Sequence, residues 1–153
     1  MRNSTGPTKL VGEGSDMVMP SSEWPPFAAS TSSRRAILIV EDEILIRTLA
    51  SDELRDAGFD VIEAVNGDEA LAVLKSGVRV DLVFSDVRMP GSLDGVGLLG
   101  AVKVGFPEIP VILTSAHLEP TIAVTNGAVC FVAKPYPMNT VVAIIERELA
   151  RTV

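Results

Sequence analysis

The sequence predicts a doubly wound α/β domain, in which a five-stranded parallel sheet carries helices on both faces. Five short apolar runs indicate the strands, and they lie at residues 36–40, 59–64, 80–85, 109–115 and 128–133. Each run precedes a segment with helical character, and these segments lie at 44–58, 66–77, 94–105, 119–127 and 139–150. Strict alternation of apolar strands with amphipathic helices is typical of a parallel sheet buried between two helix layers. Right-handed crossovers then place helices on both faces.

The first half of this pattern is regular. The run AILIV at 36–40 is apolar throughout, as expected of a fully buried strand. The helix that follows has its apolar residues at helical spacing and ends at Gly58; they are Ile46, Leu49, Ala50, Leu54 and Ala57. The run FDVIEA at 59–64 alternates like a strand with one face less buried, and 66–77 forms a short helix.

The second half contains two weak helices. The run VDLVFS is a buried strand that continues to a carboxylate at Asp86, and the segment 94–105 that follows is rich in glycine. The segment 119–127 contains Pro120, which disrupts a helix interior, so the fourth helix is expected to be short or irregular. Apolar strands at 109–115 and 128–133 flank it, and an amphipathic helix closes the domain.

Composition separates the N-terminal stretch from this domain. Residues 1–35 are rich in Ser, Thr, Pro and Gly and predict a disordered extension, whereas 36–153 is predicted to be one domain. No apolar run reaches the roughly 18 residues of a membrane-spanning helix. The N-terminus also lacks the apolar segment of a signal peptide. We therefore expect a cytoplasmic protein with no membrane partner.

The charge is distributed unevenly between the two parts. Residues 1–35 hold four basic and three acidic residues, whereas 36–153 hold nine basic and seventeen acidic residues, a net charge of −8. Nucleic-acid binding depends on clustered Lys and Arg at the phosphates. The acidic balance therefore predicts no direct DNA binding.

Charged and hydroxyl residues follow four of the predicted strands. Glu41 and Asp42 follow the first strand, Asp86 ends the third, Thr114 lies at the end of the fourth, and Lys134 follows the fifth. Since parallel strands present their carboxyl ends at one edge of the sheet, these groups are expected to meet there. Clustered carboxylates repel one another and favour a hard cation such as Mg²⁺. A carboxylate at such a metal can act as a nucleophile in phosphoryl transfer, with an ammonium and a hydroxyl stabilising the phosphoryl oxygens.

At these residues the chain resembles the receiver domain of two-component response regulators. The resemblance covers about residues 36–152 and rests on LIVEDE, DLVFSDVRMPG, VILTSA and FVAKPY, in this order and at about the family's spacing. It implies a flavodoxin-like (βα)5 fold with strand order 2-1-3-4-5.

The resemblance also implies a role for each site residue. Asp86 would be the phosphorylated residue, and Glu41, Asp42, Asp86 and the backbone carbonyl of Arg88 would hold Mg²⁺. Thr114 and Lys134 would contact the phosphoryl group, and Phe131 would be the aromatic residue that rotates on phosphorylation. The Lys134–Pro135 bond is expected to be cis.

By this resemblance the protein is a single-domain response regulator. A histidine kinase or histidine phosphotransfer protein would be its phosphodonor, and an unidentified protein its downstream target. It would catalyse only its own phosphorylation and dephosphorylation, and it would be a monomer or a weak homodimer.

Two departures from the family pattern stand out. The loop after Pro90 has one extra residue, and Thr114 and Lys134 are about two residues closer in sequence than usual. The shortened fourth helix makes dimerisation through that face doubtful or points to a different partner surface.

Other readings of the same residues remain. Acids at 41–43 also suit the first turn of a helix, and Asp86 alone could be a cap. A phosphatase of the haloacid-dehalogenase type would need a second aspartate where Arg88 stands, and a flavodoxin-like nucleotide carrier would need a Gly-rich phosphate loop after 36–40. A receiver-like binding module that is never phosphorylated is the third alternative. The only histidine, His117, is assigned no role.

Overall fold

The computed structural model describes residues 33–117 and 120–152, and it contains five strands that alternate with five helices. In chain order they are β1 (Ala36–Val40), α1 (Ile44–Asp56), β2 (Asp60–Ala64), α2 (Gly67–Lys75), β3 (Leu82–Asp86), α3 (Gly95–Gly105), β4 (Val111–Ser115), α4 (Pro120–Thr125), β5 (Cys130–Ala133) and α5 (Met138–Ala150). The disordered extension was predicted for residues 1–35, and residues 1–32 of it lie outside the described residues. Arg35 is described: its carbonyl accepts a hydrogen bond from the Asp60 amide at 3.0 Å, and its side chain pairs with Asp81.

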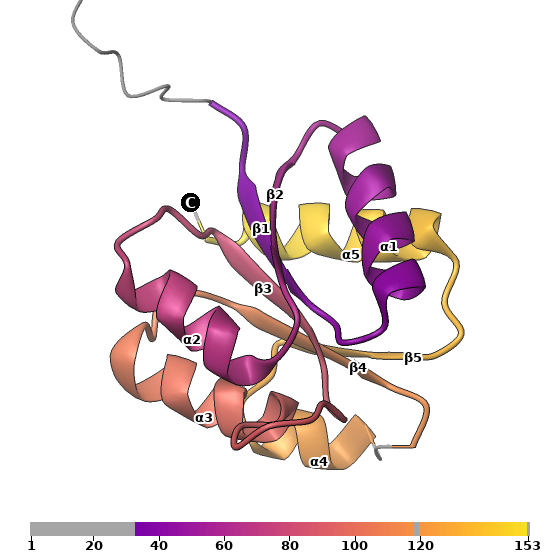
Figure 1. Cartoon of the computed structure of the whole chain (residues 1–153). Helices are drawn as coiled ribbons and strands as arrows, with labels where there is room; N and C mark the ends of the chain where they lie inside the picture. Colours follow the sequence, from indigo (N-terminus) through magenta and orange to yellow (C-terminus); the bar gives the residue numbers. More distant parts are fainter. Residues whose placement is uncertain (1–32, 118–119, 153) are drawn as a thin grey trace, which may run out of the picture. The chain divides into compact units, whose positions relative to one another are not determined.

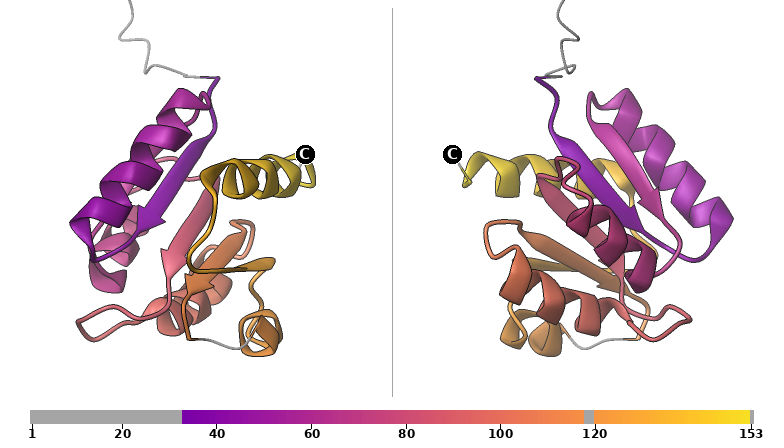
Figure 2. Two further views of the ribbon diagram at one scale, coloured as in Figure 1. Left: turned by 90° about the vertical axis from the view of Figure 1, so that its right-hand side faces the viewer. Right: turned by 60° about the vertical axis from the view of Figure 1, so that its left-hand side comes forward.

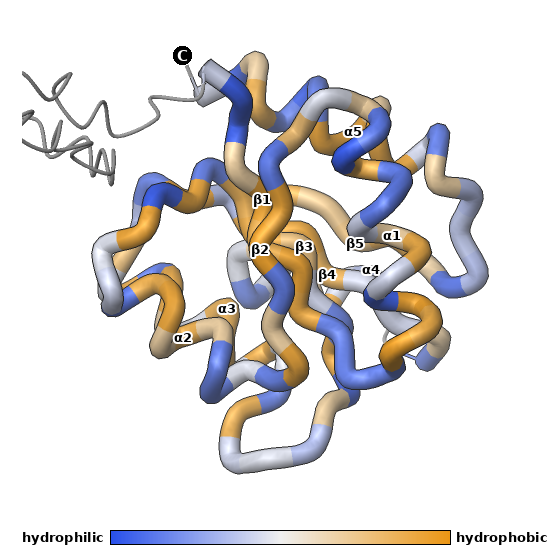
Figure 3. Tube along the Cα trace, turned by 45° about the horizontal axis from the view of Figure 1, so that its top comes forward, coloured by the Kyte–Doolittle hydropathy of each residue, from blue (hydrophilic) through white to orange (hydrophobic). Residues whose placement is uncertain are grey.

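The strands form one parallel sheet in the order β2-β1-β3-β4-β5, as predicted. Helices α1 and α5 cover one face, and α2, α3 and α4 cover the other (Figures 1 and 2). Figure 3 shows hydrophobic residues along the central strands and a mixture of hydrophobic and hydrophilic residues along the helices. The doubly wound α/β prediction is therefore confirmed.

Successive side chains of a strand point to opposite faces of the sheet, so each central strand contributes to the hydrophobic core on both faces. In β1, Ile37 and Ile39 pack with residues of α1 and α5, whereas Leu38 and Val40 pack with residues of α2, α3 and α4. All four side chains are at most 1% exposed. Burial of an aliphatic side chain contributes about 1.5–3 kcal/mol, so an apolar central strand stabilises the domain on both faces at once.

The start of β3 is set by Asp81. Its carboxylate accepts a hydrogen bond from the Ala36 amide at 2.7 Å and pairs with Arg35 and Arg79 at 3.6 and 3.2 Å. This half-buried anchor joins the amino ends of β1 and β3. The strand then continues without a polar interruption until Ser85 and Asp86.

The fourth helix is short, as predicted. It begins at Pro120 and has six residues. Gly127 follows with a φ of +99°, a conformation that favours glycine, and a side chain there would lie 2.6 Å from Cε of Lys103. In residues 33–117 and 120–152, no helix has both the length and the apolarity that crossing a membrane requires.

Candidate functional site

Four strands deliver side chains to one edge of the sheet. Asp86 is the last residue of β3 and lies in register with Thr114 of β4. Glu41 and Asp42 directly follow β1, and Lys134 directly follows β5. Because β1, β3, β4 and β5 are consecutive neighbours in the sheet, their carboxyl ends bring these residues together.

The Lys134 side chain bridges Glu41 and Asp86. Its Nζ atom donates to Glu41 Oε2 at 2.8 Å and to Asp86 Oδ2 at 3.2 Å. The Glu41 and Asp86 residues are only 3% and 6% exposed. A buried carboxylate without a partner is strongly unfavourable, so the ammonium stabilises both acids.

Three carboxylates remain against this one ammonium. One oxygen each of Glu41, Asp42 and Asp86 lies within 4.8 Å of the others. Carboxylate oxygens are the ligands that Mg²⁺ prefers, and one or two of them usually bind it together with waters or phosphate. The donor set therefore fits a magnesium ion.

The protonation equilibria reflect this crowding. Burial raises the pKa of Glu41; the hydrogen bond from Lys134 opposes this effect, and the charge of Asp86 adds to it. Burial alone would lower the pKa of Lys134, but the hydrogen bond to Glu41 and the charge of Asp86 outweigh it, and the pKa is raised. At neutral pH the lysine is therefore firmly cationic, and the carboxylates are short of positive charge.

Thr114 presents an unpaired polar atom beside Asp86. Its residue is 1% exposed, and its Oγ1 is buried without a hydrogen-bond partner among the described residues. Leaving a hydroxyl buried and unpaired costs about 1–3 kcal/mol. The register of β3 and β4 brings this hydroxyl-bearing residue to the same end of the sheet as Asp86.

A cavity of about 260 Å³ opens at Asp42, Asp86 and Lys134. Its wall comprises Asp42, Glu43, Ile46, Asp86, Arg88, Ser115, Ala116, His117 and Lys134. Sequence reasoning missed His117, whose backbone amide donates to Ser115 Oγ at 3.1 Å. The available signal was its position two residues after the end of β4, at the same edge of the sheet.

Phe131 lies apart from this wall. It is half-buried in β5, in register with Leu113, and packs against the core on the α2, α3 and α4 face. The structure therefore places Asp42, Asp86, Arg88 and Lys134 around one cavity. Glu41 is held next to it by Lys134, Thr114 lies in register with Asp86, and Phe131 lies within β5, three residues before Lys134. The Lys134–Pro135 bond is cis, as the resemblance implied.

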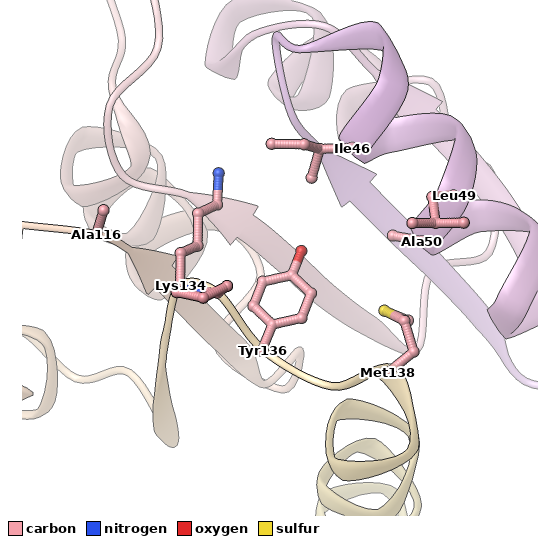
Figure 4. A pocket seen from close by; sticks show the side chains of 8 residues that line it. Ile46, Leu49, Ala50, Ala116, Lys134, Tyr136 and Met138 are labelled. Carbon is pink, nitrogen blue, oxygen red and sulfur yellow. The ribbon is translucent and has the colours of Figure 1, made fainter.

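A second, apolar cavity of about 350 Å³ lies beside the acids. It is lined by Ile46, Leu49, Ala50, Ala116, Lys134, Pro135, Tyr136 and Met138 (Figure 4). The Tyr136 ring packs edge-on against Phe84, with 5.7 Å between ring centroids. Lys134 therefore borders both cavities.

The environment of Tyr136 predicts a measurable titration. Burial raises its pKa to about 12, from about 10 for a free tyrosine. The sequence holds one tyrosine, so tyrosinate absorbance reports this side chain alone. We expect a midpoint near 12 while the circular dichroism remains native, and a midpoint near 10 in denaturant. A native midpoint near 10 would contradict the burial of the phenol.

Comparison with known proteins identifies the family. The profile described as "Response regulator receiver domain" matches residues 37–146. The chain belongs to this family. The receiver domain is similar to NtrX of Azorhizobium caulinodans, a nitrogen assimilation regulatory protein, with 39% identity over 117 residues that cover 74% of this chain and 26% of NtrX.

Two further relatives support the receiver domain. The DNA-binding transcriptional regulator NtrC of Salmonella typhimurium is 36% identical over 120 residues, which cover 76% of this chain and 25% of NtrC. The crystal structure of the receiver domain of NtrX from Brucella abortus matches with a TM-score of 0.69 at 36% identity and covers 74% of this chain and 98% of that one. The chain thus spans about a quarter of the length of the curated relatives it matches.

One prediction about partners is wrong. Net charge suggested no direct DNA binding, but the relatives of this receiver domain include DNA-binding transcriptional regulators. The charge argument fails because it describes one domain, whereas this chain spans about a quarter of those regulators. For the same reason, these relatives do not support the prediction of a single-domain protein.

Proposed function

We propose that the receiver domain, residues 36–153, accepts a phosphoryl group on Asp86 in a Mg²⁺-dependent reaction. The donor is the phosphorylated histidine of a kinase or phosphotransfer protein. Phosphorylation then changes the contacts that the domain makes with other proteins. In regulators such as NtrC, which bind DNA, transcription is one output that a receiver domain of this kind can control.

One observation carries the proposal: Lys134 Nζ lies between Glu41 and Asp86, at 2.8 and 3.2 Å. The arrangement holds one Asp86 oxygen, Oδ2, beside the ammonium. A side chain so close to the acceptor oxygen is placed to pair with the charge of a phosphoryl group as it arrives. The adjacent acids supply the ligands for a divalent cation.

The chemistry is the transfer of a phosphoryl group from the donor imidazole to a carboxylate oxygen of Asp86. An oxygen of Asp86 attacks the phosphorus atom, and the bond from phosphorus to the donor imidazole breaks as the new P–O bond forms. The imidazole nitrogen keeps the electron pair and takes up a proton from solvent. Bound Mg²⁺ would neutralise charge on the phosphoryl oxygens. Glu41, Asp42, Asp86 and the Arg88 carbonyl are the groups that would hold the ion.

Thr114 and Phe131 would convert the modification into a structural change. The unpaired Thr114 Oγ1 gains a hydrogen-bond acceptor when a phosphoryl oxygen is present on Asp86. A shift of Thr114 toward this oxygen alters the packing at the carboxyl end of β4. Phe131, in the neighbouring strand, is only half-buried and can move inward. Phosphorylation then favours one of two conformations that exist beforehand.

The rival enzymatic functions have less support. A phosphatase of the haloacid-dehalogenase type needs an acid two residues after the nucleophile, where this chain has the exposed Arg88. A nucleotide carrier would have to place phosphates against the acids after β1. The match to the receiver family favours a phosphoacceptor over both.

The test is the intact mass of the protein after incubation with acetyl phosphate, with and without Mg²⁺. We expect a gain of one phosphoryl group that needs both Mg²⁺ and Asp86, so that Asp86→Asn shows none. Asp52→Asn is the matched control, because it removes an exposed carboxylate of α1 outside the cavity. It is expected to gain the group as the unsubstituted protein does. Absence of any gain, with phosphorylated kinases included as donors, would leave a binding module that is never phosphorylated.

A further inference from the structure

The loop between β3 and α3 is fastened to the first turn of α2. The Ser92 hydroxyl donates to Asp68 Oδ1 at 2.6 Å, and the Ser92 amide donates to Asp68 Oδ2 at 3.2 Å. Both oxygens of one carboxylate are thus used by one residue that lies 24 positions away. We call this contact the Asp68–Ser92 clasp.

Two glycines next to the clasp, Gly91 and Gly67, leave no room for a side chain. Gly91 has a φ of +105°, and a Cβ atom there would lie 2.9 Å from Asp68 Oδ2. A Cβ atom on Gly67 would collide with the carbonyl oxygen of Leu93. The inserted stretch after Pro90 therefore rests closely on the start of α2, where the sequence alone showed only an extra residue.

The same loop carries one wall of the acidic cavity. Arg88 lines that cavity together with Asp42 and Asp86, and it lies four positions before Ser92. The far end of the loop is held as well, since the Gly95 amide donates to the Val87 carbonyl at 2.8 Å. The clasp therefore fixes the middle of a segment whose two ends are already anchored.

We propose that Asp68 and Ser92 are positioning residues for the metal site: the Asp68–Ser92 clasp sets the position of the Arg88 backbone carbonyl toward a bound Mg²⁺. This inference rests on the proposed function, which gives the carbonyl its role. Without the clasp, the loop tip is free to move away from α2, and the carbonyl is less often in place. Because the clasp is exposed, its removal leaves the two buried cores intact.

The test is the Mg²⁺ affinity of the full chain, measured by calorimetry with the metal alone and no phosphodonor. We expect Ser92→Ala and Asp68→Ala each to weaken the affinity roughly three- to tenfold, at or below the usual range for groups that orient a metal ligand. The double variant is expected to be no weaker than Asp68→Ala, since both substitutions remove the same contact. Ser92→Thr keeps the hydroxyl and is expected to bind as the unsubstituted protein does.

Separate controls test whether a change in charge or a loss of folding could explain a weaker Mg²⁺ affinity. Glu69→Ala removes one exposed negative charge next to Asp68 without touching Ser92, and it is expected to leave the affinity unchanged. Ser92→Ala changes no charge at all, so its effect cannot come from long-range attraction of the cation. Circular dichroism confirms that each variant is folded before titration.

Two results would overturn the inference, and they differ. If Ser92→Ala and Asp68→Ala both bind Mg²⁺ as tightly as the unsubstituted protein, the clasp only stabilises the loop, and the proposed function stands. If the unsubstituted protein binds no Mg²⁺, the metal requirement of the proposed function fails together with this inference.

Discussion

Replacing Gly95 by alanine is expected to destabilise the domain by about 3 kcal/mol, at the upper end of the usual cost of overpacking. The new Cβ atom would collide with the Asp86 carbonyl oxygen and lie 2.7 Å from Cα of Val87. Both are backbone atoms in or next to the buried β3 strand, so neither can move aside without displacing the strand. Urea unfolding followed by circular dichroism measures the change in the free energy of unfolding.

Gly100 provides the matched control in the same helix. A Cβ atom at Gly100 meets nothing within 4 Å, and the position is exposed. Gly100→Ala is therefore expected to stabilise the domain by about 0.5–1 kcal/mol, because alanine favours the helix more than glycine does. Equal effects of the two substitutions would contradict the close approach of α3 to the end of β3. Gly95→Ala should also slow phosphorylation, since the carbonyl it displaces belongs to Asp86.

Lys134→Met is expected to lower the free energy of unfolding by about 2 kcal/mol at neutral pH in the absence of metal. The substitution keeps an aliphatic side chain but leaves Glu41 and Asp86 without their ammonium. Removal of one partner from a fully buried ion pair costs about 3–5 kcal/mol, and we expect less because the Lys134 side chain is 15% exposed. The pKa of Lys134 is raised in the folded state, so its contribution is complete below the pKa of a free lysine and is lost as the pH rises through the higher folded value.

Two controls, added Mg²⁺ and the variant Lys75→Met, test whether the loss of stability in Lys134→Met comes from the missing ammonium at the acids. A saturating concentration of Mg²⁺ is expected to restore part of the lost stability, because the cation replaces the missing positive charge near the three carboxylates. Lys75→Met removes an exposed lysine from the last turn of α2 and is expected to cost no more than about 0.3–1 kcal/mol. A similar loss in both variants, unaffected by Mg²⁺, would show that the acids do not depend on Lys134.

The predicted site residues could be read from the sequence because each stands where a strand ends. Asp86, Glu41 and Lys134 follow apolar runs, and the parallel topology brings the ends of such runs together. The finer arrangement needed the fold. Nothing local distinguishes Thr114 as unpaired or places Phe131 apart from the cavity wall, since both depend on neighbours supplied by other strands.

The sequence by itself determined the alternation of strands and helices, the weak fourth helix and the edge of the sheet where charged groups gather. These features depend on periodicity and on the chain order of apolar runs, which are local properties. Only the tertiary structure decided that Lys134 joins Glu41 to Asp86, and that Ser92 fastens the inserted loop to Asp68. Those contacts link residues 24 to 93 positions apart, and their geometry depends on how the packed helices and strands place each backbone.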